Sequence, residues 1–179
     1  IIIGKTSQDE FGFGGFSVNT KKIPKNPYDI SRTCGGSSGG AAGFTAFTKS
    51  PHIALGESTG GSIVNPASFC GVAGLTPTYG LVSRYGLIDY ANTLDKIGTL
   101  AKEVSDAFLG LYHIAGYDEK DSTSLPQKIF PEKKVKKIAV IKESLDVDKE
   151  IKDIILSKLK NYDIISLPSI KRYSLPAYY

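Results

Sequence analysis

The sequence predicts an α/β fold, because segments patterned like strands alternate with segments patterned like helices. Short apolar runs rich in β-branched residues, as in 1–3 and 164–167, have the composition of buried strands. Apolar residues recur at helical spacing over 103–115 and 148–160. Glycine-rich turns separate several of these segments, which is typical of a sheet protein with helical connections.

The expected elements follow in chain order. Residues 6–33 are polar and rich in glycine, and are expected to form loop with one short helix. The expected helices cover 41–49, 103–115 and 148–160, with a helical turn after Ile63. The expected strands cover 1–3, 52–55, 137–141 and 164–167, and short strands alternate with loops over 71–99. Residues 118–136 are polar and resemble a linker.

The composition indicates a globular chain whose 179 residues can bury one sizeable core or part of a larger one. The net charge is +4, and the one dense basic run, at 133–137, is expected to be solvated rather than to bind nucleic acid. Cys34 and Cys70 lack CxxC spacing, so we expect buried apolar residues, no metal centre and a reducing, cytoplasmic location. No apolar run is long enough for a membrane span, and no signal peptide is recognisable.

Both ends of the sequence have the pattern of structure that continues further. The chain opens on an apolar triplet without Met, and it closes at 175–179 without a polar tail. We therefore expect residues 1–179 to form a single domain that is truncated at both ends.

Two glycine turns carry the chemistry that the sequence suggests. In the second turn, Thr59, Gly60 and Gly61 precede a helix start, so several backbone N–H groups could point at one negative oxygen. Ser62 ends this turn and is placed like a nucleophile beside its own oxyanion hole.

A serine nucleophile needs a base to accept its proton. His52 and His113 are the only histidines, and their positions in a strand and a helix indicate structural roles. A serine and lysine relay is the remaining solution, with Ser37 and Ser38 of the first glycine turn as its candidates. A phosphate or nucleotide binder and a non-catalytic domain stay open as alternatives, although neither turn has the lysine of a P-loop.

Three motifs follow one another closely: GGSSGG at 35–40, GGSI at 60–63 and PASFCG at 66–71. Together they resemble the amidase signature family. Five further motifs narrow the resemblance to the A subunits of glutamyl/aspartyl-tRNA amidotransferases: DEF at 9–11, GLTPTYG at 74–80, SRYGL at 83–87, LDKIG at 94–98 and DSTS at 121–124. The resemblance covers nearly the whole chain, and it implies a central mixed β-sheet flanked by helices, incomplete in these residues.

The resemblance also implies a role for each residue of the two turns. Ser62 would be the nucleophile, and Ser37, preceded by a cis peptide bond, would pass a proton between Ser62 and a lysine. The amides of Thr59, Gly60 and Gly61 would form the oxyanion hole, and Ser38 would add a hydrogen bond.

The implied function is glutamine hydrolysis that supplies ammonia for the amidation of Glu-tRNA(Gln) or Asp-tRNA(Asn). ATP and magnesium would bind a partner B subunit rather than this chain, a small C subunit would complete the complex, and tRNA would be bound mainly through the partner. A stand-alone amidase for another small amide and a non-catalytic scaffold remain as alternatives.

The sequence departs from the family pattern at several points. The family's catalytic lysine lies in a Lys-Asp-Asn context upstream of these residues, so we expect the chain alone to have little or no amidase activity. Ser58 stands where many members have Asp, and Val64 stands where many have Arg.

Overall fold

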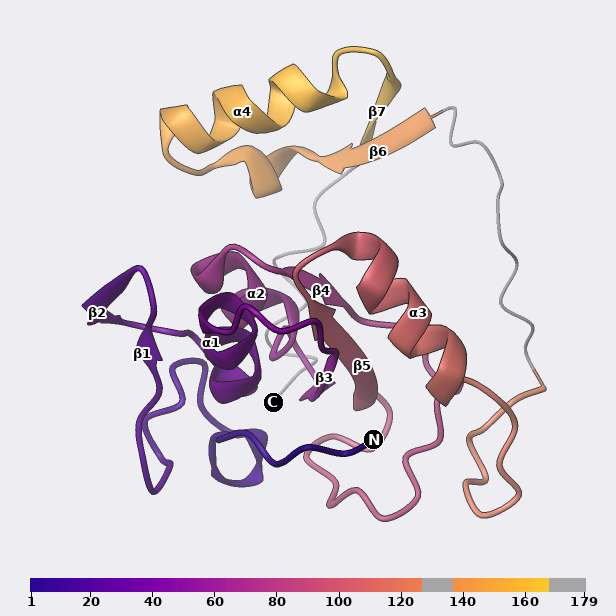
Figure 1. The fold of residues 1–179 in the computed structure, drawn as a ribbon. Coiled ribbons are helices and arrows are strands. Elements are labelled where there is room, and N and C mark those ends of the chain that lie inside the picture. The colour runs from indigo at the N-terminus through magenta and orange to yellow at the C-terminus, as the bar shows by residue number, and fades with distance from the viewer. Residues whose placement is uncertain (127–136, 168–179) are drawn as a thin grey trace. The chain divides into compact units, whose positions relative to one another are not determined.

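A computed structural model describes residues 1–126 and 137–167. The chain divides into two compact units, Ile1–Ile129 and Phe130–Tyr179, each of which is described by itself (Figure 1). The expectation of a single domain stays a prediction.

The first unit is built on a three-stranded antiparallel sheet with the strand order β3-β5-β4. Its strands are β3 (Ala54–Ser58), β4 (Ala73–Leu75) and β5 (Lys96–Ala101). Gly56 pairs with Gly98 across β3 and β5, and Ser58 pairs with Lys96 at the end of β3. The second glycine turn therefore begins where β3 leaves the sheet.

Helices cover both faces of this sheet (Figure 1). They are α1 (Gly39–Phe47), α2 (Val64–Cys70) and α3 (Val104–Ile114). Side chains alternate along β5: Leu100 is buried in a cluster with residues of α1 and α2, whereas the Thr99 hydroxyl donates to the Ala107 carbonyl of α3 at 2.7 Å. The expected helices at 41–49 and 103–115 are confirmed.

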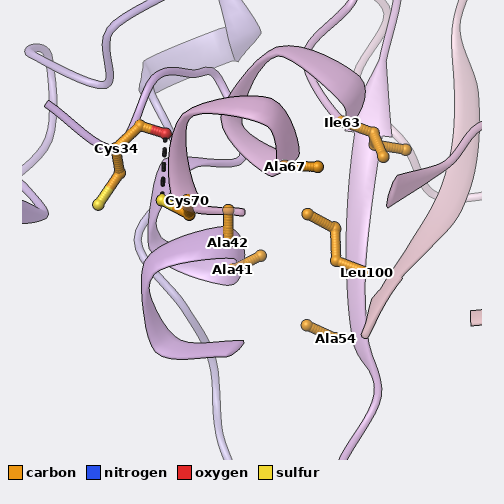
Figure 2. Close-up of a cluster of buried hydrophobic side chains, with 8 residues drawn as sticks. All are labelled: Cys34, Ala41, Ala42, Ala54, Ile63, Ala67, Cys70 and Leu100. Atoms are coloured by element: carbon orange, nitrogen blue, oxygen red, sulfur yellow. Dashed lines mark hydrogen bonds between the residues drawn. The ribbon is translucent and has the colours of Figure 1, made fainter. Parts of the chain in front are cut away.

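The core of the first unit lies between α1, α2 and the sheet. Figure 2 shows its buried side chains, which are Cys34, Ala41, Ala42, Ala54, Ile63, Ala67, Cys70 and Leu100. Both cysteines are fully buried, as expected, and the Cys70 thiol donates to the Cys34 carbonyl with a sulfur–oxygen distance of 3.6 Å. Burial raises the pKa of Cys70 to about 12. The small residues let the two helices approach each other and bring the glycine turns before them together.

The N-terminal stretch contains the expected short helix and a pair of strands that the sequence does not predict. The helix is a 3-10 helix, η1 (Glu10–Gly12), and the antiparallel strands are β1 (Lys25–Asn26) and β2 (Asp29–Thr33). The prediction of a strand at 1–3 is wrong: these residues are exposed and form no strand among the described residues. A β-branched run sets a strand only where another strand pairs with it.

The second unit is a strand–helix–strand motif. Its elements are β6 (Lys137–Ile141), η2 (Lys142–Leu145), α4 (Lys149–Leu159) and β7 (Asp163–Leu167). The two strands pair in parallel, with Ile138 opposite Ile164. The predicted strands at 137–141 and 164–167 and the predicted helix at 148–160 are confirmed, as is the α/β class.

Several predicted features fall on residues outside the described part of the chain. They are the basic run at 133–136, most of the linker at 118–136, and the C-terminal segment at 175–179. Within the described ranges, the helices are all too short or too polar to cross a bilayer.

Candidate active site

The two glycine turns lie side by side, joined by hydrogen bonds through Ser38. The Ser38 N–H donates to the Ser62 carbonyl at 3.1 Å, and the Ser38 hydroxyl donates to the Glu57 carbonyl at 3.1 Å. Ser37, Ser38 and Ser62, predicted as one group from the sequence, therefore meet in one place. Ser38 supplies the connection through both its backbone and its side chain.

The first turn has an unusual backbone that its neighbours hold in place. The peptide bond between Gly36 and Ser37 is cis, which confirms that expectation. Gly35 has a φ of +76°, and a Cβ there would lie 2.5 Å from Asn65 Oδ1, so the position requires glycine. Asn65 Oδ1 also accepts the Gly36 N–H at 3.1 Å. Asn65 thus ties the first turn to the start of α2.

A buried hydroxyl supports the same turn from the other side. Ser17 is fully buried, and its Oγ lies 2.9 Å from the Gly35 carbonyl and 3.1 Å from the Ser37 carbonyl. The same Oγ accepts the Gly39 N–H at 3.2 Å. The main chain around Ser37 is therefore held by several hydrogen bonds, none of which involves the Ser37 hydroxyl.

The Ser37 hydroxyl is buried and has no hydrogen-bond partner among the described residues. Buried hydroxyls are usually paired, because an unpaired polar group away from water costs about 1 to 3 kcal/mol. A buried hydroxyl with free donor and acceptor capacity is chemically able to receive and pass on a proton.

The second turn is buried at its start and exposed in its middle. Thr59 is buried, Gly60 is exposed, and Ser62 is half-buried. A Cβ added at Gly61 would meet nothing within 4 Å, so the space beside this residue is open. The Gly61 carbonyl accepts the Asn65 N–H at 2.8 Å as α2 begins. A small molecule could approach Ser62 from this side.

Two buried carboxyl groups lie behind the second turn. The Thr59 Oγ1 is 3.0 Å from Glu57 Oε1 and 2.6 Å from Asp95 Oδ1. Asp95 is fully buried and accepts the N–H groups of Tyr90 at 2.8 Å and Ala91 at 3.0 Å. Burial raises the pKa of Glu57 above its ordinary 4.5, because the carboxylate loses water there.

Neither histidine takes part in this site. His52 Nε2 pairs with Thr45 Oγ1 at 3.0 Å, and its Nδ1 pairs with the Ser50 carbonyl at 3.1 Å. His113 lies on α3 with its ring against Tyr112. His52 therefore has a structural role and His113 is an exposed residue, as the sequence indicated for structural or surface histidines, and the site has no serine–histidine pair.

Four residues of the site were assigned no role from the sequence: Ser17, Glu57, Asn65 and Asp95. Glu57 and Asn65 lie close to the second turn in the sequence, so their position was the available signal. Asp95 lies within the LDKIG motif. Ser17 gave no signal, because its role depends on burial and on a positive φ of 53°.

Comparison with known proteins places this geometry in a family. The family model described as Amidase matches residues 1–163. The chain belongs to the amidase signature family. The expected fold is confirmed by a crystal structure of the A subunit of glutamyl-tRNA(Gln) amidotransferase from Thermotoga maritima, which has a TM-score of 0.90 and 36% identity. It covers 100% of this chain, which spans 43% of that protein.

Curated relatives that match the whole chain are named as A subunits of glutamyl-tRNA(Gln) amidotransferase. The protein from Picosynechococcus is 45% identical and that from Microcystis aeruginosa is 46% identical, each over 100% of this chain. The chain spans 41% and 40% of their lengths. The crystal structure of a peptide amidase has 30% identity and a TM-score of 0.78 over 94% of the chain.

Proposed function

We propose that the full-length protein carrying this chain is the glutamine-hydrolysing A subunit of a tRNA-dependent amidotransferase. The observation that carries this proposal is the similarity to A subunits, at 45% identity over the whole chain. The narrower motifs at 74–80 and 83–87 support it over a stand-alone amidase. The chain spans about two fifths of those relatives, so substrate and partners remain part of the proposal.

In this proposal Ser62 is the nucleophile. Its Oγ attacks the side-chain amide carbon of glutamine, and its proton passes through the buried hydroxyl of Ser37 to a lysine that the family resemblance places outside these residues. The N–H groups of Thr59, Gly60 and Gly61 stabilise the negative oxygen of the tetrahedral intermediate.

Collapse of that intermediate completes the reaction. The bond from carbon to nitrogen breaks, and the nitrogen leaves as ammonia after it takes back a proton. Water then hydrolyses the ester on Ser62 and releases glutamate. Ser38 supports these steps by holding the two turns together, through its bonds to the carbonyls of Ser62 and Glu57.

The proposed partner is a B subunit that binds ATP and magnesium and receives the ammonia, with a small C subunit in the same complex. Glu-tRNA(Gln) or Asp-tRNA(Asn) would be held mainly by the B subunit, in the cytoplasm. The proposed chemistry of the A subunit needs no cofactor or metal, because serine, lysine, water and backbone donors take part in its steps.

The test is ammonia release from glutamine by the full-length protein in complex with its partner subunit. We expect Ser62→Ala to abolish it, whereas Ser68→Ala, a matched change of an exposed serine on α2, leaves it unchanged. Release of ammonia from a peptide amide without the partner would favour the stand-alone amidase. Equal activity of Ser62→Ala and the parent protein would refute the assignment of the nucleophile.

A further inference from the structure

The Thr59 hydroxyl lies between two carboxyl groups that come from distant parts of the chain. Its Oγ1 is 3.0 Å from Glu57 Oε1 and 2.6 Å from Asp95 Oδ1. All three side chains are buried, with exposed fractions of 7% for Glu57, 8% for Thr59 and 0% for Asp95. Because these residues have little contact with solvent, an unfavourable contact among them is costly.

A count of hydrogens argues against two ionised carboxyl groups at these distances. A hydroxyl group has one hydrogen to donate, and a carboxylate can only accept. With two carboxylates, one of the two short contacts would bring lone pairs together without a hydrogen, which is costly in a buried site. One carboxyl group must supply a second proton.

The surroundings indicate which carboxyl group holds that proton. The Asp95 carboxyl group accepts the backbone N–H groups of Tyr90 at 2.8 Å and Ala91 at 3.0 Å, so N–H donors already point at its oxygens. Apart from Thr59, the side-chain carboxyl group of Glu57 receives a hydrogen bond only from Gln8 Nε2, at 3.2 Å, among the described residues.

The charged groups nearby agree with this assignment. The pKa of Glu57 is raised, and burial is the largest cause. The hydrogen bond with Thr59 opposes this rise, the charge of Asp95 adds to it, and the charge of Lys96 opposes it. The Lys96 ammonium donates to the carbonyl of Thr59 at 3.4 Å and to that of Leu94, and burial lowers its own pKa. It forms no ion pair with Glu57 or Asp95 among the described residues.

We propose that Glu57 keeps its proton and donates it to Thr59, that Thr59 donates to Asp95, and that this hydrogen-bonded chain positions the oxyanion loop. Glu57 is thus a positioning residue that acts through Thr59, whose backbone N–H belongs to the proposed oxyanion hole. The inference rests on the proposed amidase function for its catalytic consequence, but the protonation of Glu57 can be measured without it.

The sign of the pH dependence follows from the protonated form. Because the pKa of Glu57 in the folded protein lies above its ordinary 4.5, the interaction is fully present below that ordinary value. It is lost as the pH rises through the raised pKa, when Glu57 becomes a carboxylate facing Thr59 and Asp95. The loop should therefore loosen toward higher pH.

Infrared difference spectroscopy tests the proton directly. In a pH series on the full-length protein, we expect the C=O band of a protonated carboxylic acid that persists above pH 4.5, is absent from Glu57→Gln and is retained in Glu103→Gln, a control at an exposed position. If the parent protein and Glu57→Gln show the same acid band, Glu57 is ionised and the proposal is wrong. This readout holds whether or not the protein hydrolyses glutamine.

Activity across pH tests the positioning role. Glutamine can donate through its amide as the protonated acid does, so Glu57→Gln should keep activity near that of the parent, whereas Glu57→Ala should lose up to about 100-fold in kcat. The ratio of parent activity to Glu57→Gln activity should fall as pH rises. Taking the ratio cancels the titrations that the two proteins share. A flat ratio, or an equal loss in both variants, would overturn the role. Absence of activity in every variant would count against the proposed function instead.

Discussion

Ser17 offers a quantitative test of how the first glycine turn is held. Its buried Oγ lies 2.9 Å from the Gly35 carbonyl and accepts the Gly39 N–H at 3.2 Å. The Ser37 carbonyl, 3.1 Å from the same Oγ, also accepts the Asp9 N–H at 2.9 Å and so keeps a partner when the hydroxyl is removed. Ser17→Ala therefore leaves two buried backbone groups unpaired.

Each unpaired group costs about 1 to 3 kcal/mol, and loss of the Ser17 hydroxyl offsets part of this because that hydroxyl no longer has to be buried. We therefore expect the free energy of unfolding to fall by about 2 to 4 kcal/mol. Ser17 also has a φ of 53°, where a Cβ is unfavourable. Ser17→Gly should therefore lose about 1 kcal/mol less than Ser17→Ala.

The assay is urea unfolding of the full-length protein, followed by circular dichroism, with midpoints compared at constant slope. Ser31→Ala is the matched control, because the Ser31 hydroxyl donates to Asp29 at 2.6 Å but is exposed, and its loss should change stability by less than about 0.5 kcal/mol. A change of that small size for Ser17→Ala, or an alanine variant as stable as the glycine variant, would refute this account of the turn.

Three further predictions concern the core and the turns. Leu100→Ala should cost about 3 to 5 kcal/mol in urea unfolding, because Leu100 is fully buried, whereas Leu125→Ala, at an exposed position, should cost far less. Gly35→Ala should abolish ammonia release, since its Cβ would lie 2.9 Å from the backbone of Pro66, whereas Gly4→Ala has open space and should be neutral. Cys70, with a pKa of about 12, should have only about one thiolate in ten thousand molecules at pH 8, so alkylation followed by peptide mapping should label it only after unfolding.

Local patterns predicted most of the helices and several strands. The helix at 103–115 has regular apolar spacing and appears as α3 (Val104–Ile114), and the strand–helix–strand pattern at 137–167 appears as β6, α4 and β7. The strand predicted at 52–55 lies two to three residues later, at Ala54–Ser58, because pairing with β5 rather than composition sets its limits. Strand limits depend on a partner that local sequence does not contain.

Residues of the site were predictable from the sequence where their surroundings are local. Ser37, Ser38 and Ser62 were recognised because their glycine contexts are local. Asp95 meets Thr59 across 36 positions of sequence, and only the antiparallel pairing of β3 with β5 brings them together. Side chains that support a site from distant segments leave little signal in one sequence.

The two turns form one mechanical unit, and this follows from how they are tied. The Ser38 N–H donates to the Ser62 carbonyl, and the Ser38 hydroxyl donates to the Glu57 carbonyl on β3. Asn65, at the start of α2, accepts the Gly36 N–H. A shift of either turn must break one of these bonds or move the other turn with it. In the proposed mechanism, this coupling keeps the proton relay and the nucleophile in register, since a displacement of about 1 Å at a reacting group costs about 100-fold in rate. Supporting residues such as Asn65 are therefore expected to affect catalysis without touching the substrate.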